Sequence, residues 1–288
     1  MSLRALRHIP SFFVALLLNL CYNSYIIKNA LKKGFIMRLC VVIPCFFRNT
    51  DFCDAIKAIA SIGYDAAELW GWGGIDPARA KAVLDETGVE LISLCTTEFR
   101  LNDPEYREAF LEGLKSTCEF ASKLGVKKII TQVGNDTGKS RELQHSLIVD
   151  GLNAAVPVLE QYGIVLMIEP LNDRFDHKGY YLTSSAEAFE IVKEVGSPFV
   201  KVIFDIYHQQ ITEGNIIPNI VNNLPYIAHL HGAGHPGRHE LQLGESNYHA
   251  IIEAVDKAGY KGAMGLEYFP TVDPIDSLRE AHKLFCKN

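Results

Sequence analysis

From about residue 39 to its end, the chain alternates short apolar runs with longer segments of helical periodicity. The apolar runs are rich in β-branched residues and stop at a loop, as buried parallel strands do. Most of the helical segments close on a glycine, a common helix stop signal. The predicted strands are 39–44, 65–69, 89–94 and 127–133, followed by four runs that end at Glu169, Asp205, His231 and Glu267. The predicted helices are 51–62, 104–124, 140–162, 184–195, 216–224, 247–258 and 274–285, with one more that opens at Asp76.

Eight alternating strand and helix units predict a parallel sheet covered by helices. The number eight favours a closed (β/α)8 barrel over an open, doubly wound sheet. Residues 37–288 have about the length of one such barrel, which typically takes roughly 250 residues. The sequence therefore predicts a single α/β domain, a TIM barrel, over residues 37–288.

The first 36 residues do not continue this pattern. Arg4 and Arg7 precede an apolar stretch at 9–20, as in a signal peptide, but a proline and an asparagine interrupt it and no small-residue cleavage motif follows. The stretch is also shorter than a membrane-spanning helix requires. Because a predicted strand begins directly after Met37, we interpret residues 1–36 as an extension outside the fold, with Met37 as the natural start. A cleaved or membrane-attached leader is the alternative.

Composition narrows the class of protein. Apolar residues make up 48% and charged residues 22% of the chain, which is ordinary for a globular domain with a large core. A net charge of −6 without a basic stripe argues against nucleic acid as a partner, and we expect no stable membrane association. The seven cysteines are scattered and form no C-x-x-C pair, which favours reduced thiols and a cytoplasmic location. Whether the chain forms a homo-oligomer stays open.

The last four predicted strands each end on a residue that can bind a divalent metal: Glu169, Asp205, His231 and Glu267. In a closed parallel barrel the C-terminal ends of the strands meet on one face, where barrel active sites lie. Three carboxylates brought together repel one another unless a cation lies between them. One such residue alone would more often be a helix cap or a packed histidine, but four successive strands with the same ending predict a metal site.

Other residues near the strand ends are candidates for supporting roles. His229 lies two positions before His231, so it points to the same side one layer deeper, where it packs or orients His231. Glu68 ends the second strand and is a candidate to support the ligands from behind. Trp70 and Trp72 follow it, and they either cap the mouth with apolar surface or fill a loop.

Two residues are candidates for contact with substrate. His208 follows Asp205 by three positions, a spacing that returns its imidazole to the same mouth, although a simple loop residue is an equal alternative. Arg238 is a natural anchor for an anionic substrate because arginine binds carboxylates bidentately, and a surface ion pair is the alternative. The stretch 232–237 fits G-x-G-x-x-G, but it contains Pro236 and no helix is expected at its last glycine, so a loop beside the site is favoured over a dinucleotide site.

Six short motifs carry a family resemblance that covers essentially residues 37–288. Together they resemble the xylose isomerase-like barrel superfamily, and within it they look most like hydroxypyruvate isomerases. The motifs are 168–172 (IEPLN), 204–208 (FDIYH), 229–231 (HLH), 236–240 (PGRHE), 244–248 (GESNY) and 266–268 (LEY).

The resemblance implies that Glu169 and Glu267 act as catalytic acid and base, while Asp205 and His231 complete the shell of a divalent metal, Mn²⁺ or Mg²⁺. The reaction it implies is the interconversion of hydroxypyruvate and tartronate semialdehyde through an enediolate. Hydroxypyruvate isomerases tend to carry Gln at the position of His231, whereas the related ketose 3-epimerases carry His. This departure leaves open a ketose 3-epimerase that acts on free sugars such as tagatose, psicose or ribulose.

Two other classes share the barrel architecture. A DNA-repair phosphodiesterase resembling endonuclease IV would need further His and acid ligands on strands two to four and a basic face, and the sequence offers neither. A non-catalytic sugar-binding barrel would differ in that bound metal supports no turnover.

Overall fold

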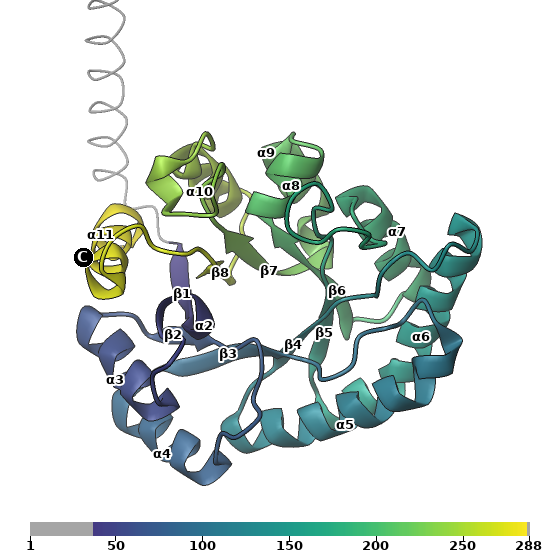
Figure 1. Cartoon of the computed structure of the whole chain (residues 1–288), viewed down its shortest axis with the longest axis horizontal. Helices are drawn as coiled ribbons and strands as arrows, with labels where there is room; N and C mark the ends of the chain where they lie inside the picture. The colour runs from purple at the N-terminus through teal and green to yellow at the C-terminus, as the bar shows by residue number, and fades with distance from the viewer. Residues whose placement is uncertain (1–36, 287–288) are drawn as a thin grey trace, which may run out of the picture.

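A computed structural model describes residues 37–286, and the expectation for residues 1–36 lies outside this range. Eight parallel strands close into a barrel in chain order, β1 to β8, and the helices surround it (Figure 1). The predicted (β/α)8 barrel is therefore confirmed. The strands are β1 Arg38–Val42, β2 Ala66–Glu68, β3 Glu90–Cys95, β4 Lys128–Thr131, β5 Val165–Ile168, β6 Val200–Asp205, β7 Ile227–Gly232 and β8 Ala263–Leu266.

The long helices lie close to their predicted positions. Several begin at a side chain that accepts a backbone N–H, such as Ser140 before α6, and end at a left-handed glycine, such as Gly125 with φ of 79°. Within residues 37–286, no helix is both long and apolar enough to cross a membrane. The helices are α2 Ile43–Phe46, α3 Phe52–Ile62, α4 Pro77–Thr87, α5 Arg107–Leu124, α6 Arg141–Tyr162, α7 Ser185–Val195, α8 Ile206–Thr212, α9 Ile216–Asn223, α10 Tyr248–Lys257 and α11 Pro274–Phe285, with short 3-10 helices η2 Pro104–Tyr106, η3 Leu224–Tyr226 and η4 Leu241–Leu243.

Two local expectations are wrong. The first strand ends at Val42 rather than at residue 44, because Pro44 lies in the first turn of helix α2, where its missing N–H costs nothing. The segment after β6 is helix α8 and not a loop. Asp205 starts it, since its Oδ1 accepts the backbone N–H groups of Tyr207 at 2.7 Å and His208 at 3.3 Å.

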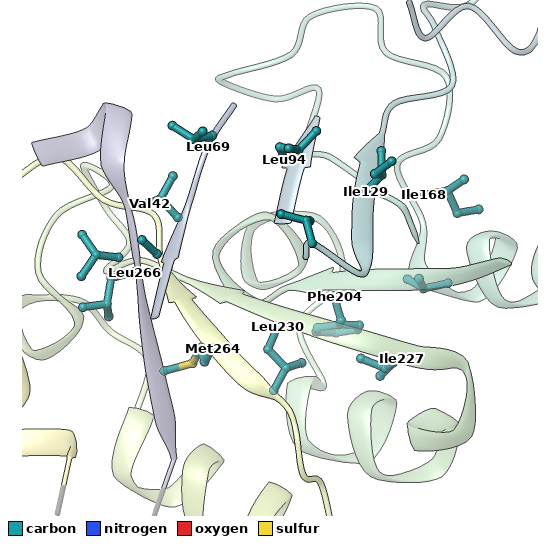
Figure 2. Close-up of a cluster of buried hydrophobic side chains, with 14 of the residues drawn as sticks. Val42, Leu69, Leu94, Ile129, Ile168, Phe204, Ile227, Leu230, Met264 and Leu266 are labelled. Atoms are coloured by element: carbon teal, nitrogen blue, oxygen red, sulfur yellow. The ribbon is translucent and has the colours of Figure 1, made fainter. Parts of the chain in front are cut away.

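The hydrophobic core has two parts. The larger joins one face of the strands to the inner faces of the helices, and Figure 2 labels residues of this layer on β1 and on β3 to β8, among them Ile129, Phe204 and Leu266. Smaller clusters on the alternate strand positions fill the barrel itself, such as Ile130, Met167 and Ile203 of β4, β5 and β6. This packed interior makes the barrel a rigid base for the strand ends above it.

Candidate active site

The four predicted metal ligands meet at the C-terminal end of the barrel. Glu169 directly follows β5, Asp205 ends β6, His231 lies in β7 and Glu267 directly follows β8. Each offers one ligand atom, and these atoms all lie within 4.8 Å of one another. All four side chains are buried, with exposed fractions between 1% and 7%. The register places Asp205 beside His231 and His231 beside Gly265, so neighbouring strands bring the ligands to one level.

The donor set fits a divalent cation. Nδ1 of His231 lies 3.3 Å from Oε2 of Glu267 and 3.9 Å from Oε1 of Glu169. Neither that Nδ1 nor Oε1 of Glu169 has a hydrogen-bond partner among residues 37–286. Buried polar atoms are normally paired, and three carboxylates with one imidazole are suitable ligands for Mn²⁺ and similar ions. The unpartnered atoms therefore face a position that a cation would fill.

The surroundings of the three carboxylates give them different pKa values. Burial and the negative charge of Glu267 raise the pKa of Glu169 to about 8 and that of Asp205 to about 6. Burial would raise the pKa of Glu267 too, but the nearby charges of His231 and Arg238 outweigh it and hold that pKa well below its usual range. Burial opposes the charged form of His231, yet Glu267 and Glu68 raise the pKa of its imidazole well above the ordinary value.

Glu267 has a donor on each carboxylate oxygen. Nε1 of Trp70 donates to Oε1 at 2.6 Å, and Nη2 of Arg238 donates to Oε2 at 2.5 Å. The sequence suggested that Trp70 caps the mouth with apolar surface or fills a loop, and nothing in the chain pattern signals its hydrogen bond. Trp72 does not share this role, because it stacks on Phe120 with the ring centroids 4.8 Å apart.

Arg238 lies inside the mouth and not on the surface, so the alternative of a surface ion pair is wrong. Its side chain is 13% exposed, and its guanidinium carbon lies 5.1 Å from the ring centroid of Tyr207. The backbone of Arg238 has a φ of 56°, a conformation that costs energy outside glycine. The N–H of Phe269 donates to its carbonyl at 2.8 Å, which ties the loop to the segment after β8.

His208 lies on helix α8 and is fully buried. Its Nδ1 accepts from the backbone N–H of Asn172 at 3.2 Å and from the Asn172 side-chain amide at 2.7 Å. Burial and Arg238 lower the pKa of His208 well below its ordinary value. The proton of the neutral ring therefore lies on Nε2, which has no hydrogen-bond partner in the described chain and lies 3.6 Å from Oδ2 of Asp205.

Asn172 is a functional candidate that residue-by-residue reasoning missed. Its Oδ1 accepts the backbone N–H of Phe175 at 3.0 Å and its Nδ2 also donates to Asp176 at 2.8 Å, which fixes the orientation of the amide. The only signal in the sequence is the position of Asn172 at the end of the motif 168–172.

The chain belongs to the xylose isomerase-like TIM barrel family, whose sequence model matches residues 56–288. It is 30% identical over 252 residues to the hydroxypyruvate isomerase of Escherichia coli K12, covering 84% of this chain and 97% of that protein. It is 30% identical over 244 residues to the 2-oxo-tetronate isomerase of Cupriavidus necator, covering 81% and 93%. A D-psicose 3-epimerase structure with D-tagatose from Clostridium cellulolyticum shares the fold, with a TM-score of 0.73, 21% identity and coverage of 87% and 100%.

The raised pKa values predict how metal and pH act on stability. Unfolded carboxyl groups ionise near pH 4, whereas Asp205 and Glu169 keep their protons in the folded, metal-free chain up to about pH 6 and about pH 8. Their contribution to stability is therefore present at low pH and is lost as the pH rises from about 4 to about 8. A bound ion takes the place of these protons, so Mn²⁺ should raise the melting temperature more at pH 8 than at pH 5.5. Calorimetric scans with and without Mn²⁺ measure this, and an equal increment at both pH values would contradict the ligand assignment.

Proposed function

We propose that the protein is a divalent-metal-dependent isomerase that interconverts hydroxypyruvate and 2-hydroxy-3-oxopropanoate (tartronate semialdehyde) through an enediolate. The observation that carries the proposal is a pair of carboxylates at one buried centre, Glu169 with an unpartnered oxygen and Glu267 with both oxygens occupied. Relatives named hydroxypyruvate isomerase and 2-oxo-tetronate isomerase support an isomerase of a small 2-oxo acid. As part of the same proposal, the protein acts in the cytoplasm.

Glu169, Asp205, His231 and Glu267 would hold the ion, and the oxygen-rich set favours Mn²⁺ or Mg²⁺. When bound, such an ion supplies positive charge that stabilises the negative charge developing on the substrate oxygens.

Proton transfer falls to the two glutamates. The reaction removes a proton from C3 of hydroxypyruvate, moves the C–H electron pair into the C2–C3 bond and the carbonyl π pair onto O2. The O3 hydroxyl then loses its proton as C3 becomes the aldehyde, and C2 and O2 each gain one proton. Glu169 is the candidate to accept the first proton, because an ion bound at the centre would take the place of the proton that its raised pKa retains and would leave the carboxylate ionised. Once Arg238 has moved from it to the substrate, Glu267 is the candidate to take up the O3 hydroxyl proton and return it to C2, while Glu169 would pass its proton to O2 and regain its starting state. His208 would donate its Nε2–H to a substrate oxygen as a neutral hydrogen-bond donor.

Arg238 gives the site a preference for acids. Its guanidinium already binds one carboxylate, that of Glu267, through Nη2 at 2.5 Å, while its Nε donates to the backbone carbonyl of Glu267 at 3.2 Å. Exchange of one carboxylate for the other keeps the guanidinium paired and frees an oxygen of Glu267. The substrate that this arrangement favours is therefore an anion with neighbouring carbonyl and hydroxyl groups.

A ketose 3-epimerase acting on free sugars is the second candidate. Glu169 and Glu267 follow β5 and β8, so they reach the centre from different parts of the ring. An epimerase needs such an arrangement, because it takes a proton from one face of a carbon and returns it to the other. His231 and the likeness to a D-psicose 3-epimerase structure support this alternative.

A panel of substrates offered to one metal-loaded sample tests the proposed function. We expect turnover of hydroxypyruvate with Mn²⁺ or Mg²⁺, and at least tenfold lower kcat/KM for free tagatose, psicose and ribulose. Chromatography of the products measures each reaction. Faster turnover of a ketose than of hydroxypyruvate would establish the epimerase instead, and no turnover of any member would contradict both.

Replacement of Arg238 by Met tests the carboxylate anchor. The variant keeps the apolar stem and removes the guanidinium, so hydroxypyruvate should lose roughly 2–5 kcal/mol of binding. Dihydroxyacetone is the matched neutral substrate, since a CH₂OH group replaces the carboxylate, and it should lose much less. Because Arg238 also contacts Glu267, the Mn²⁺ affinity of the variant is measured in parallel. An equal loss for both substrates would argue against an anchoring role.

Two amide substitutions separate proton transfer from metal binding. Glu267→Gln keeps the shape and one potential ligand oxygen but removes the group that would carry the proton, so turnover should fall by about 10²–10⁴-fold while metal content falls less. Asp205→Asn should act mainly through metal loss, and excess Mn²⁺ should partly restore its activity. Turnover and metal content are measured on the same samples. If excess metal restores Glu267→Gln to full activity, Glu267 is only a ligand.

A further inference from the structure

A second buried group of metal-binding residue types lies directly below the proposed metal ligands. Glu68 at the end of β2 and His229 of β7 join His231 in it, and their exposed fractions are 1%, 0% and 2%. Nε2 of His229 lies 2.8 Å from Oε1 of Glu68, and Nε2 of His231 lies 3.2 Å from Oε2. The hydroxyl of Ser93 on β3 donates to the same Oε2 at 2.5 Å. Neither Glu68 nor His229 belongs to the upper set of ligands.

The hydrogen bonds fix which nitrogen of His231 faces upward. An ionised carboxylate only accepts hydrogen bonds, so the Nε2 atoms of both histidines carry protons that point at Glu68. Nδ1 of His231 therefore faces Glu169 and Glu267, at 3.9 Å from Oε1 of Glu169 and 3.3 Å from Oε2 of Glu267. The imidazole thus turns Nδ1 to the ligand position while its other nitrogen is anchored below, and a bound ion would take the place of the Nδ1 proton.

A glycine on the neighbouring strand makes room for this pair. Gly265 of β8 lies beside His231 in the sheet register. A Cβ at this position would lie 2.5 Å from Oε1 of Glu68 and 2.6 Å from Cδ2 of His231, well inside contact distance. The backbone of β8 therefore packs directly against both side chains and prevents the ring from tilting.

We propose that Glu68 is a positioning residue of the metal centre: it fixes the tautomer and the orientation of His231, and His229, Ser93 and Gly265 hold Glu68 in place. The proposal rests on the proposed metal centre and deepens it. A carboxylate behind a ligating histidine increases the basicity of the ring, and its loss typically lowers metal affinity by about 10–100-fold. The competing interpretation is that Glu68, His229 and His231 bind a second ion of their own.

The first experiment measures Mn²⁺ affinity and stoichiometry by titration calorimetry, without substrate, in the full chain and in Glu68→Gln. The amide turns one accepting oxygen into a donor, so it no longer suits both histidines. We expect one ion per chain in the parent and about 10–100-fold weaker binding in the variant. Two ions per chain, one of them lost in Glu68→Gln, would establish the second site and overturn the proposal.

Three variants separate positioning from general destabilisation. Gly265→Ala leaves every polar group in place and drives a methyl group between Glu68 and His231, so it should also weaken Mn²⁺ binding. Glu240→Gln is the matched control, since Glu240 is a buried carboxylate that accepts from Thr271 at 2.9 Å and Ser277 at 2.9 Å and belongs to neither group of potential ligands. It should lower the melting temperature without a tenfold loss of Mn²⁺ affinity. An equal affinity loss in Glu240→Gln and Glu68→Gln would overturn the positioning role.

A double-mutant cycle tests whether Glu68 acts through His231. In a His231→Gln background, Glu68→Gln should cause little further loss of Mn²⁺ affinity, because the ring that it orients is gone. Additive losses would overturn the proposal. Absence of divalent-ion binding in the parent chain would overturn the metal centre itself, and with it this inference. Normal binding that Glu68→Gln leaves unchanged would overturn the inference alone.

Discussion

Charge balance among buried carboxylates is the constraint on which this site depends. Glu169, Asp205 and Glu267 lie within a few ångströms of one another at the end of the barrel, where little water reaches them. Such a group is unstable unless positive charge or protons accompany it. Arg238, His231 and the raised pKa values of Glu169 and Asp205 each meet part of this requirement. A divalent ion would meet the rest.

The closed barrel allows these carboxylates to remain close together. Each ligand stands at the end of a strand whose lower part is locked into a packed interior, so repulsion cannot push the strands apart. The layer below contributes as well, because Glu68 adds negative charge beneath His231 and thereby favours a cation above it. The barrel interior therefore holds Glu68 in place, and Glu68 in turn holds the imidazole of His231 at the ligand position.

The sequence predicts the parts of this arrangement that strand geometry controls. The hydrophobic periodicity, the number of strands and the residues at the strand ends are sufficient to place Glu169, Asp205, His231 and Glu267 together, because parallel strands of a barrel end at one face. The conformation of the loops cannot be predicted in this way. The inward position of Arg238 depends on a left-handed backbone and on a hydrogen bond to Phe269, neither of which leaves a pattern in the chain.

The second roles of two residues, Asp205 and Trp70, were also missed. Asp205 both offers an oxygen to the centre and starts helix α8, and a pattern that reads it as a ligand does not predict the helix. Trp70 combines an apolar ring at the mouth with an N–H on Glu267, and composition indicates only the first property. The hydrogen bond of Trp70 depends on Glu267, which is distant in sequence. The helix that Asp205 starts depends on a local cap, and the sequence pattern there is equally compatible with a loop.

The same contacts give the two glutamates different chemistry. Because both residues are glutamates, either could act as the acid or as the base. Glu267, however, is held as an anion by Trp70 and Arg238, while Glu169 has an oxygen without a donor. A group held as an anion by fixed donors is a poor proton acceptor, and a buried one with a raised pKa is a good one. Arrival of an anionic substrate would draw Arg238 away from Glu267 and raise the proton affinity of that carboxylate. In this way the binding of the substrate would itself prepare the second glutamate for its step.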